Sequence, residues 1–444
     1  MESSNTLFTV NNNSHKHVIS LGSGNILILI AVCVDLFTPI LIWKGIIPAN
    51  LRWISHAAVL IMMIGCIFRM IAKDSIPPVF LWMIAFSILW VSVAIYQEQG
   101  LLTTIWGWWL FFQFPFIGLF TYLSPNLPEK FPETFRKIAI LMLVFEVAIQ
   151  IIQYLSGEAI GDNLAGSFGK NGTGNLIIFL IFIDCMYLGY WITSKKWIAL
   201  VFVLSLSMLS SILGELKLFP FAILAIGFLA AIIFAFKYHT LFKLVKYFVI
   251  LSVILVSFFY LYNNVVMKGK NNTLQQLITN PQKLIGYLNS TTRSYEDGFH
   301  FTDIRRNAAL RIGWSSLQKD HFTLLFGWGL GSRSESKSLN ITGVGLSSGN
   351  LGLSVGTSLL VMMQELGILG LLFLGIFFIW VILKLFQGIR DHPDSNITEF
   401  RYGLLLFTIF WPVWLWYNTA WTLRVPMLLY WFSLGYVLSK NNSR

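Results

Sequence analysis

The chain has 444 residues, of which 56% are hydrophobic and only 11% are charged. A soluble domain carries roughly 25% charged residues, so this composition excludes an ordinary soluble protein and predicts a polytopic membrane protein. In lipid every backbone polar group needs an internal partner, and the alternating ten-residue segments of a membrane barrel are absent from the sequence. We therefore expect an all-α fold, a transmembrane helix bundle.

The net charge of +11 does not indicate nucleic-acid binding, and we expect no nucleic-acid partner. Lys and Arg of a membrane protein concentrate in the cytoplasmic loops that set its orientation. The three cysteines, Cys33, Cys66 and Cys185, lie in apolar stretches. Their spacing fits no metal motif, so we expect neither a metal site nor a disulfide framework.

Membrane-spanning helices need about 20 apolar residues each, and about twelve segments meet this requirement. We expect spans at 24–43, 54–72, 77–97, 101–123, 136–155, 174–193, 197–214, 218–236, 243–262, 358–386, 402–418 and 422–438. The spans divide the chain into an N-terminal bundle of nine spans (1–262), a large external loop (263–357) and three C-terminal spans (358–444).

The distribution of Lys and Arg predicts the orientation of these spans. The connections on the side of the N-terminus carry more of these residues, Lys195, Lys196 and Lys237 among them, than the short connections on the other side. The positive-inside rule then places both termini in the cytoplasm and the 263–357 loop outside. Long loops are translocated largely regardless of charge, so the basic character of this loop does not oppose the assignment.

The large loop is the one long polar segment of the sequence, and its excess of Lys and Arg is suited to an anionic substrate. Apolar side chains recur on one side of residues 273–288 and 302–318, which predicts two amphipathic helices on the outer membrane surface or over a cavity. A Gly-rich run at 327–332 follows. The Gly/Ser-rich segment that continues to Gly356 is interpreted as a flexible stretch that could act as a gate.

Arg305, Arg306 and Arg311 lie on the second of these expected helices. Guanidinium groups bind phosphate in a bidentate manner, so the three residues are candidates for holding a phosphorylated substrate. Anchoring to lipid headgroups is the alternative, since Arg on an amphipathic helix commonly has that function.

Glu215 and Lys217 interrupt a long apolar region between two expected spans, near the outer face. Charged residues in such a place are costly and usually functional, although an ordinary turn with two snorkelling side chains is the alternative. On a helix, positions two apart do not face each other, so an ion pair between the two is not required.

Two further stretches contain candidate polar groups. Residues 161–172 are Gly-rich and include Lys170; they could line an anion or sugar site, although a flexible connector is the more ordinary interpretation. Glu365 lies at the entry to the tenth span. It is a candidate base, or alternatively a structural acid that pairs with a loop Arg. Gly367 and Gly370, which follow it, would allow close helix packing.

A few polar residues lie inside the expected spans. Asp35 and Asp184 are isolated on apolar segments. Glu146, Gln150 and Gln153 share one helix face, where they could line a polar groove or form hydrogen bonds between helices.

Three of these stretches together resemble the superfamily of O-antigen polymerases and O-antigen ligases, which are glycosyltransferases of the bacterial envelope. Residues 166–171, Gly-Ser-Phe-Gly-Lys-Asn, resemble its Gly-x-Phe-x-x-(Pro)-Asn segment. Residues 311–331 resemble the Arg…Trp…Gly-x-Gly-x-Gly run of its large external loop. Residues 358–371 resemble its Leu-x-x-Glu-x-Gly-Ile-x-Gly re-entry, and the long loop between the ninth and tenth spans is similar as well.

Departures from the family pattern favour one branch of this superfamily. Its ligases have a His about nine residues before the Glu, where this chain has Gly356. Many members have an Arg near the end of the seventh span, where this chain offers Lys217, and the Arg that usually precedes the first Gly-rich motif is missing. The resemblance therefore favours a polymerase of O-antigen, capsule or exopolysaccharide and leaves the identity of the general base open.

By this resemblance, the chain would transfer a glycan from an undecaprenyl-pyrophosphate donor to a sugar hydroxyl of another lipid-linked repeat unit. The reaction would take place without a metal or cofactor, at the outer face of the bacterial cytoplasmic membrane. A chain-length regulator would be a partner protein, and the chain would also contact membrane lipid. The expected catalytic residues are Arg311, Lys217, Glu215 and Glu365, and the expected substrate-binding residues are Arg305, Arg306, Arg333, Lys170 and Asn171.

Two other functions are compatible with such a chain. The first is an O-antigen ligase, which transfers glycan to a lipid or protein acceptor. The second is a flippase or other transporter of lipid-linked oligosaccharides. Transporters of that kind often contain inverted repeats, and no repeat is visible in this sequence.

Overall fold

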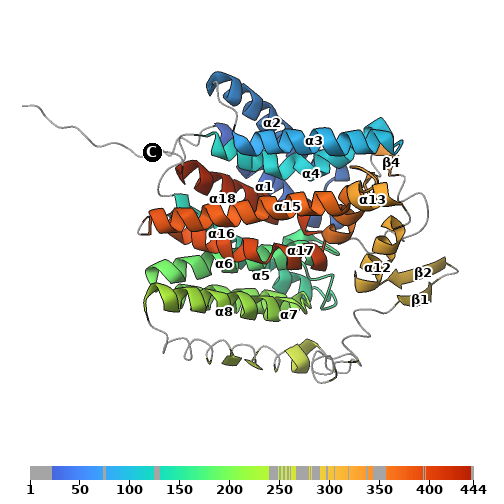
Figure 1. Ribbon diagram of the computed structural model, residues 1–444. Helices are drawn as coiled ribbons and strands as arrows, with labels where there is room; N and C mark the ends of the chain where they lie inside the picture. The colour runs from blue at the N-terminus through green and yellow to red at the C-terminus, as the bar shows by residue number, and fades with distance from the viewer. Residues whose placement is uncertain are drawn as a thin grey trace, which may run out of the picture.

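A computed structural model shows an all-α multi-pass membrane bundle whose long helices lie roughly parallel to one another (Figure 1). It describes residues 23–73, 77–124, 131–239, 306–318, 320–336, 339–343, 357–393, 395 and 397–441, together with parts of 249–304. The expected ninth span at 243–262, the expected helix at 273–288 and Arg305 lie wholly or largely outside the described residues.

The elements of the bundle follow the apolar segments of the sequence. Its α-helices are α1 (Ser23–Trp43), α2 (Trp53–Lys73), α3 (Pro78–Tyr96), α4 (Leu101–Tyr122), α5 (Phe131–Leu155), α6 (Thr173–Ser194), α7 (Trp197–Leu213), α8 (Phe219–Lys237), α12 (Arg306–Leu317), α13 (His321–Phe326), α15 (Ser358–Asp391), α16 (Thr398–Ile409), α17 (Trp411–Tyr417) and α18 (Arg424–Asn441). Short helical turns occur at η1 (Ala49–Arg52), η2 (Gly166–Phe168), η3 (Tyr262–Val266) and η5 (Ala420–Thr422). Within the described residues, seven helices are long and apolar enough to cross a membrane.

The helix α6 forms the centre of the bundle. It is apolar on all sides, as a helix buried on all sides must be, and nearly all of its side chains are buried. It packs most extensively on α16, where Gly189 and Gly403 let the two backbones approach. A Cβ added at Gly189 would lie 2.2 Å from the carbonyl oxygen of Glu399, so a larger residue would separate the helices.

The expected span at 402–418 is wrong as a single helix. The chain forms α16 up to Ile409 and then starts α17 at Trp411. Pro412 explains the break, because proline has no N–H to donate to the carbonyl four residues earlier and its ring clashes with that carbonyl. The segment that follows, η5, leads directly into α18.

The helices α12 and α13 gather with two short hairpins at one end of the bundle, on the right of Figure 1, where α15 begins. We call this the loop end, and the end where α15 and α18 terminate the far end. The expected helix at 302–318 is wrong in its first turn, because residues 299–304 form strand β2. This strand pairs antiparallel with β1 (Thr291–Glu296), and β3 (Glu335–Ser336) pairs with β4 (Ile341–Thr342).

Candidate functional site

A kink in α15 organises the loop end. The backbone of Gly367 (φ 63°, ψ −167°) is not helical, so the carbonyls just before it lose the N–H donors that a continuous helix would supply. Another segment supplies donors instead: the backbone N–H of Trp328 donates to Gln364 at 2.8 Å, and that of Gly329 donates to Glu365 at 3.0 Å. The Gly-rich run is therefore bound to α15 at the kink.

Helices α3 and α4 enclose the Gly-rich run on its other side. Trp90 Nε1 of α3 donates to the carbonyls of Leu366 at 3.0 Å and Phe326 at 3.1 Å, which joins three segments at one side chain. Gly331 has φ +91°, and a Cβ there would lie 2.2 Å from the Thr103 carbonyl of α4. Residues 327–332 are thus packed into the bundle. The expected gate at 333–356 is described only in part: residues 335–336 and 341–342 form β3 and β4, and residues 344–356 lie outside the described residues.

The carboxylate of Glu365 holds the end of the same run. Its Oε1 accepts the backbone N–H of Arg333 at 2.9 Å and the hydroxyl of Ser334 at 3.4 Å, and the residue is only 5% exposed. Burial lowers the pKa of the Arg333 guanidinium, and the nearby Glu365 carboxylate opposes that shift. Of the two roles expected for Glu365, this geometry favours a structural acid beside a loop Arg.

The 161–172 loop re-enters the bundle, and its interpretation as a flexible connector is wrong. Glu146 of α5 accepts the backbone N–H of Ser167 at 2.9 Å and also its hydroxyl. Gln153 exchanges two hydrogen bonds with the backbone of Gly166, at 3.0 and 3.1 Å. Gln150 donates to the Leu164 carbonyl at 2.6 Å. The polar face of α5 therefore serves to hold this loop.

An ion pair lies at the rim of this loop. Lys217 Nζ is 3.2 Å from Glu215 Oε1, and the two side chains are 33% and 19% exposed. They pair because they lie in the turn between α7 and α8, not on a helix, and Glu215 has φ 53°. Gly161 donates its backbone N–H to the carbonyl of Leu213, which brings the loop against this turn. Lys170 and Asn171 are exposed on the same loop.

The expected phosphate-binding arginines occupy different sides of α12. Arg306 lies against α17, where its Nε donates to the Tyr417 carbonyl at 2.7 Å and its guanidinium sits 4.4 Å from the centre of the Tyr417 ring. Arg311 lies on the exposed side of α12, away from the buried face of Ala308 and Gly313. The structure therefore does not bring Arg311 and Arg306 together.

Asn418 connects the start of α15, in the third resembling stretch, to the start of α6, which follows the first stretch in the chain. Its carbonyl accepts the backbone N–H of Ser358 at the start of α15, at 2.9 Å. Its side chain lies against the start of α6, where a Cβ at Gly174 would be 2.3 Å from Nδ2. The 161–172 loop, the Gly-rich run and the Glu365 region thus all lie at the loop end.

A polar cluster at the start of α18 was missed from the sequence. Arg424 Nε donates to Asp35 of α1 at 2.8 Å, Nη2 donates to Ser55 at 2.6 Å, and Nη1 donates to Gln113 at 3.2 Å. Nη1 also lies 2.8 Å from His56 Nε2. Asp35 was expected to be isolated, and the sequence gives no signal of a partner nearly the whole chain away.

Buried Asp184 also has a partner, the hydroxyl of Ser207 on α7, at 2.8 Å.

No candidate metal site is found within the residues that the structure describes, because no three His, Cys, Asp or Glu side chains there are grouped so that they could hold an ion.

Comparison with known proteins gives no matching family model and no similar curated protein.

Proposed function

We propose that this chain is a membrane glycosyltransferase that polymerises undecaprenyl-pyrophosphate-linked oligosaccharide repeat units at the outer face of the bacterial cytoplasmic membrane. The acceptor hydroxyl oxygen attacks the anomeric carbon of the donor glycan. The bond from that carbon to the pyrophosphate oxygen breaks, its electron pair leaves with the pyrophosphate, and the hydroxyl proton passes to a base. The product is a longer lipid-linked glycan.

One observation supports this proposal most strongly. The three stretches that resemble the polymerase and ligase superfamily are far apart in the sequence, yet all three lie at the loop end. The second and third are in direct contact, through the backbone hydrogen bonds of Trp328 and Gly329 to α15. This contact is what we expect if the stretches form parts of one site.

The proposed roles follow from exposure and contacts. Lys217 offers a partly exposed cation to the pyrophosphate, whose charge grows as the glycosidic bond breaks, so a fixed cation there lowers the barrier. Glu215, paired with it, is the candidate base. Glu365 is buried and engaged with the Gly-rich run, so we assign it a positioning role. Exposed Arg311 is the candidate for the second phosphate, whereas Arg306 is engaged with Tyr417.

Lys217→Ala tests the proposal. In polymerisation with purified lipid-linked repeat units, we expect its rate to fall by about a hundredfold, since loss of one group that stabilises the developing anion costs about 3 kcal/mol. Arg311→Ala enters the same assay as a second variant, and Arg311→Lys separates phosphate binding from lipid anchoring, in which Lys would substitute well.

The matched control is Lys137→Ala. Lys137 also pairs with a glutamate, Glu133 at 2.8 Å, but at the far end of the bundle. We expect this variant to retain wild-type activity. Wild-type rates for Lys217→Ala at equal protein amount would remove the α7–α8 turn from the site. A wild-type product extended by a single transfer to a different acceptor would identify a ligase, and transport without transfer would identify a flippase.

A further inference from the structure

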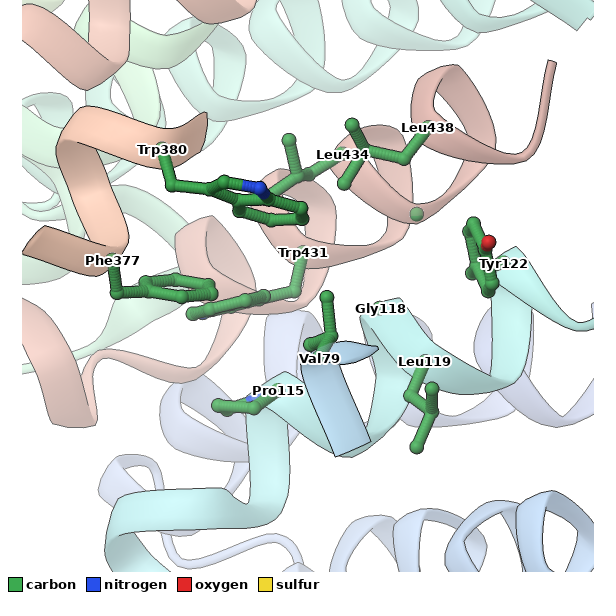
Figure 2. A pocket seen from close by; sticks show the side chains of 11 residues that line it. Val79, Pro115, Gly118, Leu119, Tyr122, Phe377, Trp380, Trp431, Leu434 and Leu438 are labelled. Carbon is green, nitrogen blue, oxygen red and sulfur yellow. The ribbon is translucent and has the colours of Figure 1, made fainter. Parts of the chain in front are cut away.

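Glycine and aromatic contacts let helices of the bundle pack closely. Along the apolar cleft shown in Figure 2, a Cβ added at Gly435 of α18 would lie 2.1 Å from the carbonyl oxygen of Gly118 in α4, and the centres of the stacked Phe377 and Trp431 rings are 5.9 Å apart. Small residues bring membrane helices together in this way and need no buried polar group. The contact between α5 and α7 is different, because it contains the fully buried amide of Gln150.

The amide of Gln150 joins two separate segments of the chain. Its Nε2 donates to the carbonyl of Leu164 in the 161–172 loop at 2.6 Å and to the carbonyl of Ser210 in the last turn of α7 at 3.2 Å. A side-chain amide has two N–H donors, so these two carbonyls use both of them. Gln150 therefore ties the 161–172 loop to the end of α7.

The end of α7 leads directly into the turn that contains Glu215 and Lys217. The last four carbonyls of a helix lack donors from within the helix, so other N–H groups have to supply them. Here the backbone N–H groups of Gly214, Leu216, Glu215 and Gly161 donate to the carbonyls of Ser210, Ser211, Ile212 and Leu213, respectively. The backbone of the turn is thus fixed to α7, and through the Ser210 carbonyl to Gln150.

The 161–172 loop also lies close to the Glu215 side chain. A Cβ added at Gly161 would lie 3.0 Å from Glu215 Oε2, and Lys217 Nζ is 3.2 Å from Oε1 of the same carboxylate. A shift of the loop relative to α7 would therefore move this carboxylate, and with it the ammonium group that is paired with it.

We propose that Gln150 is a positioning residue of the glycosyltransferase site. It holds the end of α7 against the 161–172 loop, so that Lys217 stays at the place where the leaving pyrophosphate gains charge. This role rests on the proposed function, in which Lys217 stabilises that charge. A cation lowers the barrier most when it is held in position before the reaction begins, which is what a buried clamp between the two segments provides.

A double-mutant cycle tests this role. Gln150→Met keeps an unbranched side chain of similar length and removes both N–H donors. In polymerisation of purified lipid-linked repeat units, we expect kcat to fall about tenfold with little change in KM, because the interaction that is weakened belongs to the transition state. If Gln150 acts through Lys217, the double variant Gln150→Met/Lys217→Ala should be less than about twofold slower than Lys217→Ala alone.

Thr408→Val is the control for a loss of stability without a loss of positioning. The Thr408 hydroxyl is buried like the amide of Gln150, donates to the Leu404 carbonyl at 2.6 Å and lies 3.1 Å from Tyr430 Oη, so its contacts are on α16 and α18. This variant should lower Tm and keep the wild-type kcat. If Gln150→Met does not yield folded protein, Gln150→Asn, whose amide is one methylene shorter, takes its place in the cycle with the same expectation.

The outcomes separate this role from the proposed function. Wild-type kcat for Gln150→Met beside an impaired Lys217→Ala would overturn the role of Gln150 and leave the proposed function intact. A further tenfold loss in the double variant would also overturn it, because a general loosening of the structure multiplies the two effects. Wild-type rates for Lys217→Ala, or no polymerisation by the wild type, would overturn the proposed site or the proposed function, and the role of Gln150 with it.

Discussion

Arg424 and Asp35 form an ion pair that connects α18 to α1, with 2.8 Å between Nε and Oδ1. The side chains are 21% and 3% exposed, so both charges are largely withdrawn from water. Ionisable residues inside a membrane protein are costly and are retained where they have partners or a function. Ser55, His56 and Gln113 are the other partners of the guanidinium, so this one side chain of α18 contacts α1, α2 and α4.

Asp35→Ala should be strongly destabilising, because it leaves the Arg424 charge partly buried without its counterion. Removal of one partner of a buried pair costs about 3–5 kcal/mol. We expect a clear fall in Tm by scanning fluorimetry in detergent, with the double variant Asp35→Ala/Arg424→Met less destabilised than the sum of the two single variants. Lys137→Ala, which breaks an exposed pair worth about 0.5 kcal/mol, should leave Tm nearly unchanged. Additive effects in the double variant would mean that the two side chains do not interact.

At the residue scale, the sequence showed which residues were unusual but not which residues they contact. The sequence identified Glu215 and Lys217 because they interrupt a long apolar region, and Glu365 because it lies at the entry to the tenth span. The structure places all three at the loop end. The sequence could not identify their partners. Helical spacing did not require a Glu215–Lys217 pair, which forms because the local backbone is a turn. The Asp35–Arg424 pair depends on tertiary packing alone.

Individual helices were predictable where composition decides them. The expected span at 174–193 is α6, Thr173–Ser194, because a continuous apolar run ends where Lys195 adopts a left-handed conformation. The prediction was wrong where a single residue or a distant strand intervenes. Pro412 divides the expected span at 402–418, and pairing with β1 takes residues 299–304 away from the expected helix at 302–318.

The kink of α15 gives an element-scale prediction. Gly367 has φ +63°, and a Cβ there would lie 2.4 Å from the backbone nitrogen of Gly327. Gly367→Ala should therefore cost about 1–3 kcal/mol in backbone strain alone and displace the Gly-rich run from α15. We expect a lower Tm and lost polymerisation activity.

Gly375→Ala is the matched control for this change, because Gly375 lies in the same helix with no atom within 4 Å of an added Cβ. Alanine is favoured over glycine in a helix by about 1 kcal/mol, so this variant should be as stable as the wild type or more stable. If both variants behave alike in Tm and activity, the contact between the kink and the Gly-rich run is not needed for either.

At the scale of the whole molecule, the two ends of the bundle differ in chemistry. The loop end contains the packed Gly-rich run, the re-entrant loop and the Lys217–Glu215 pair. The far end contains Arg136, Lys137, Lys195 and Lys196 near the helix termini. Cations concentrate in cytoplasmic connections of membrane proteins, so we expect the far end to face the cytoplasm.

Cysteine labelling in whole cells tests this orientation. In a background with Cys33, Cys66 and Cys185 replaced by alanine, Ser315→Cys on the exposed side of α12 should react with a membrane-impermeant maleimide. Lys137→Cys at the far end, 74% exposed, should react only after the cells are permeabilised. The second position shows that the reagent is excluded from the cytoplasm, and the first shows that it reaches the loop end. The reverse pattern would place Lys217 and the Gly-rich run in the cytoplasm, on the wrong side for polymerisation at the outer face, and the proposed function would have to be abandoned.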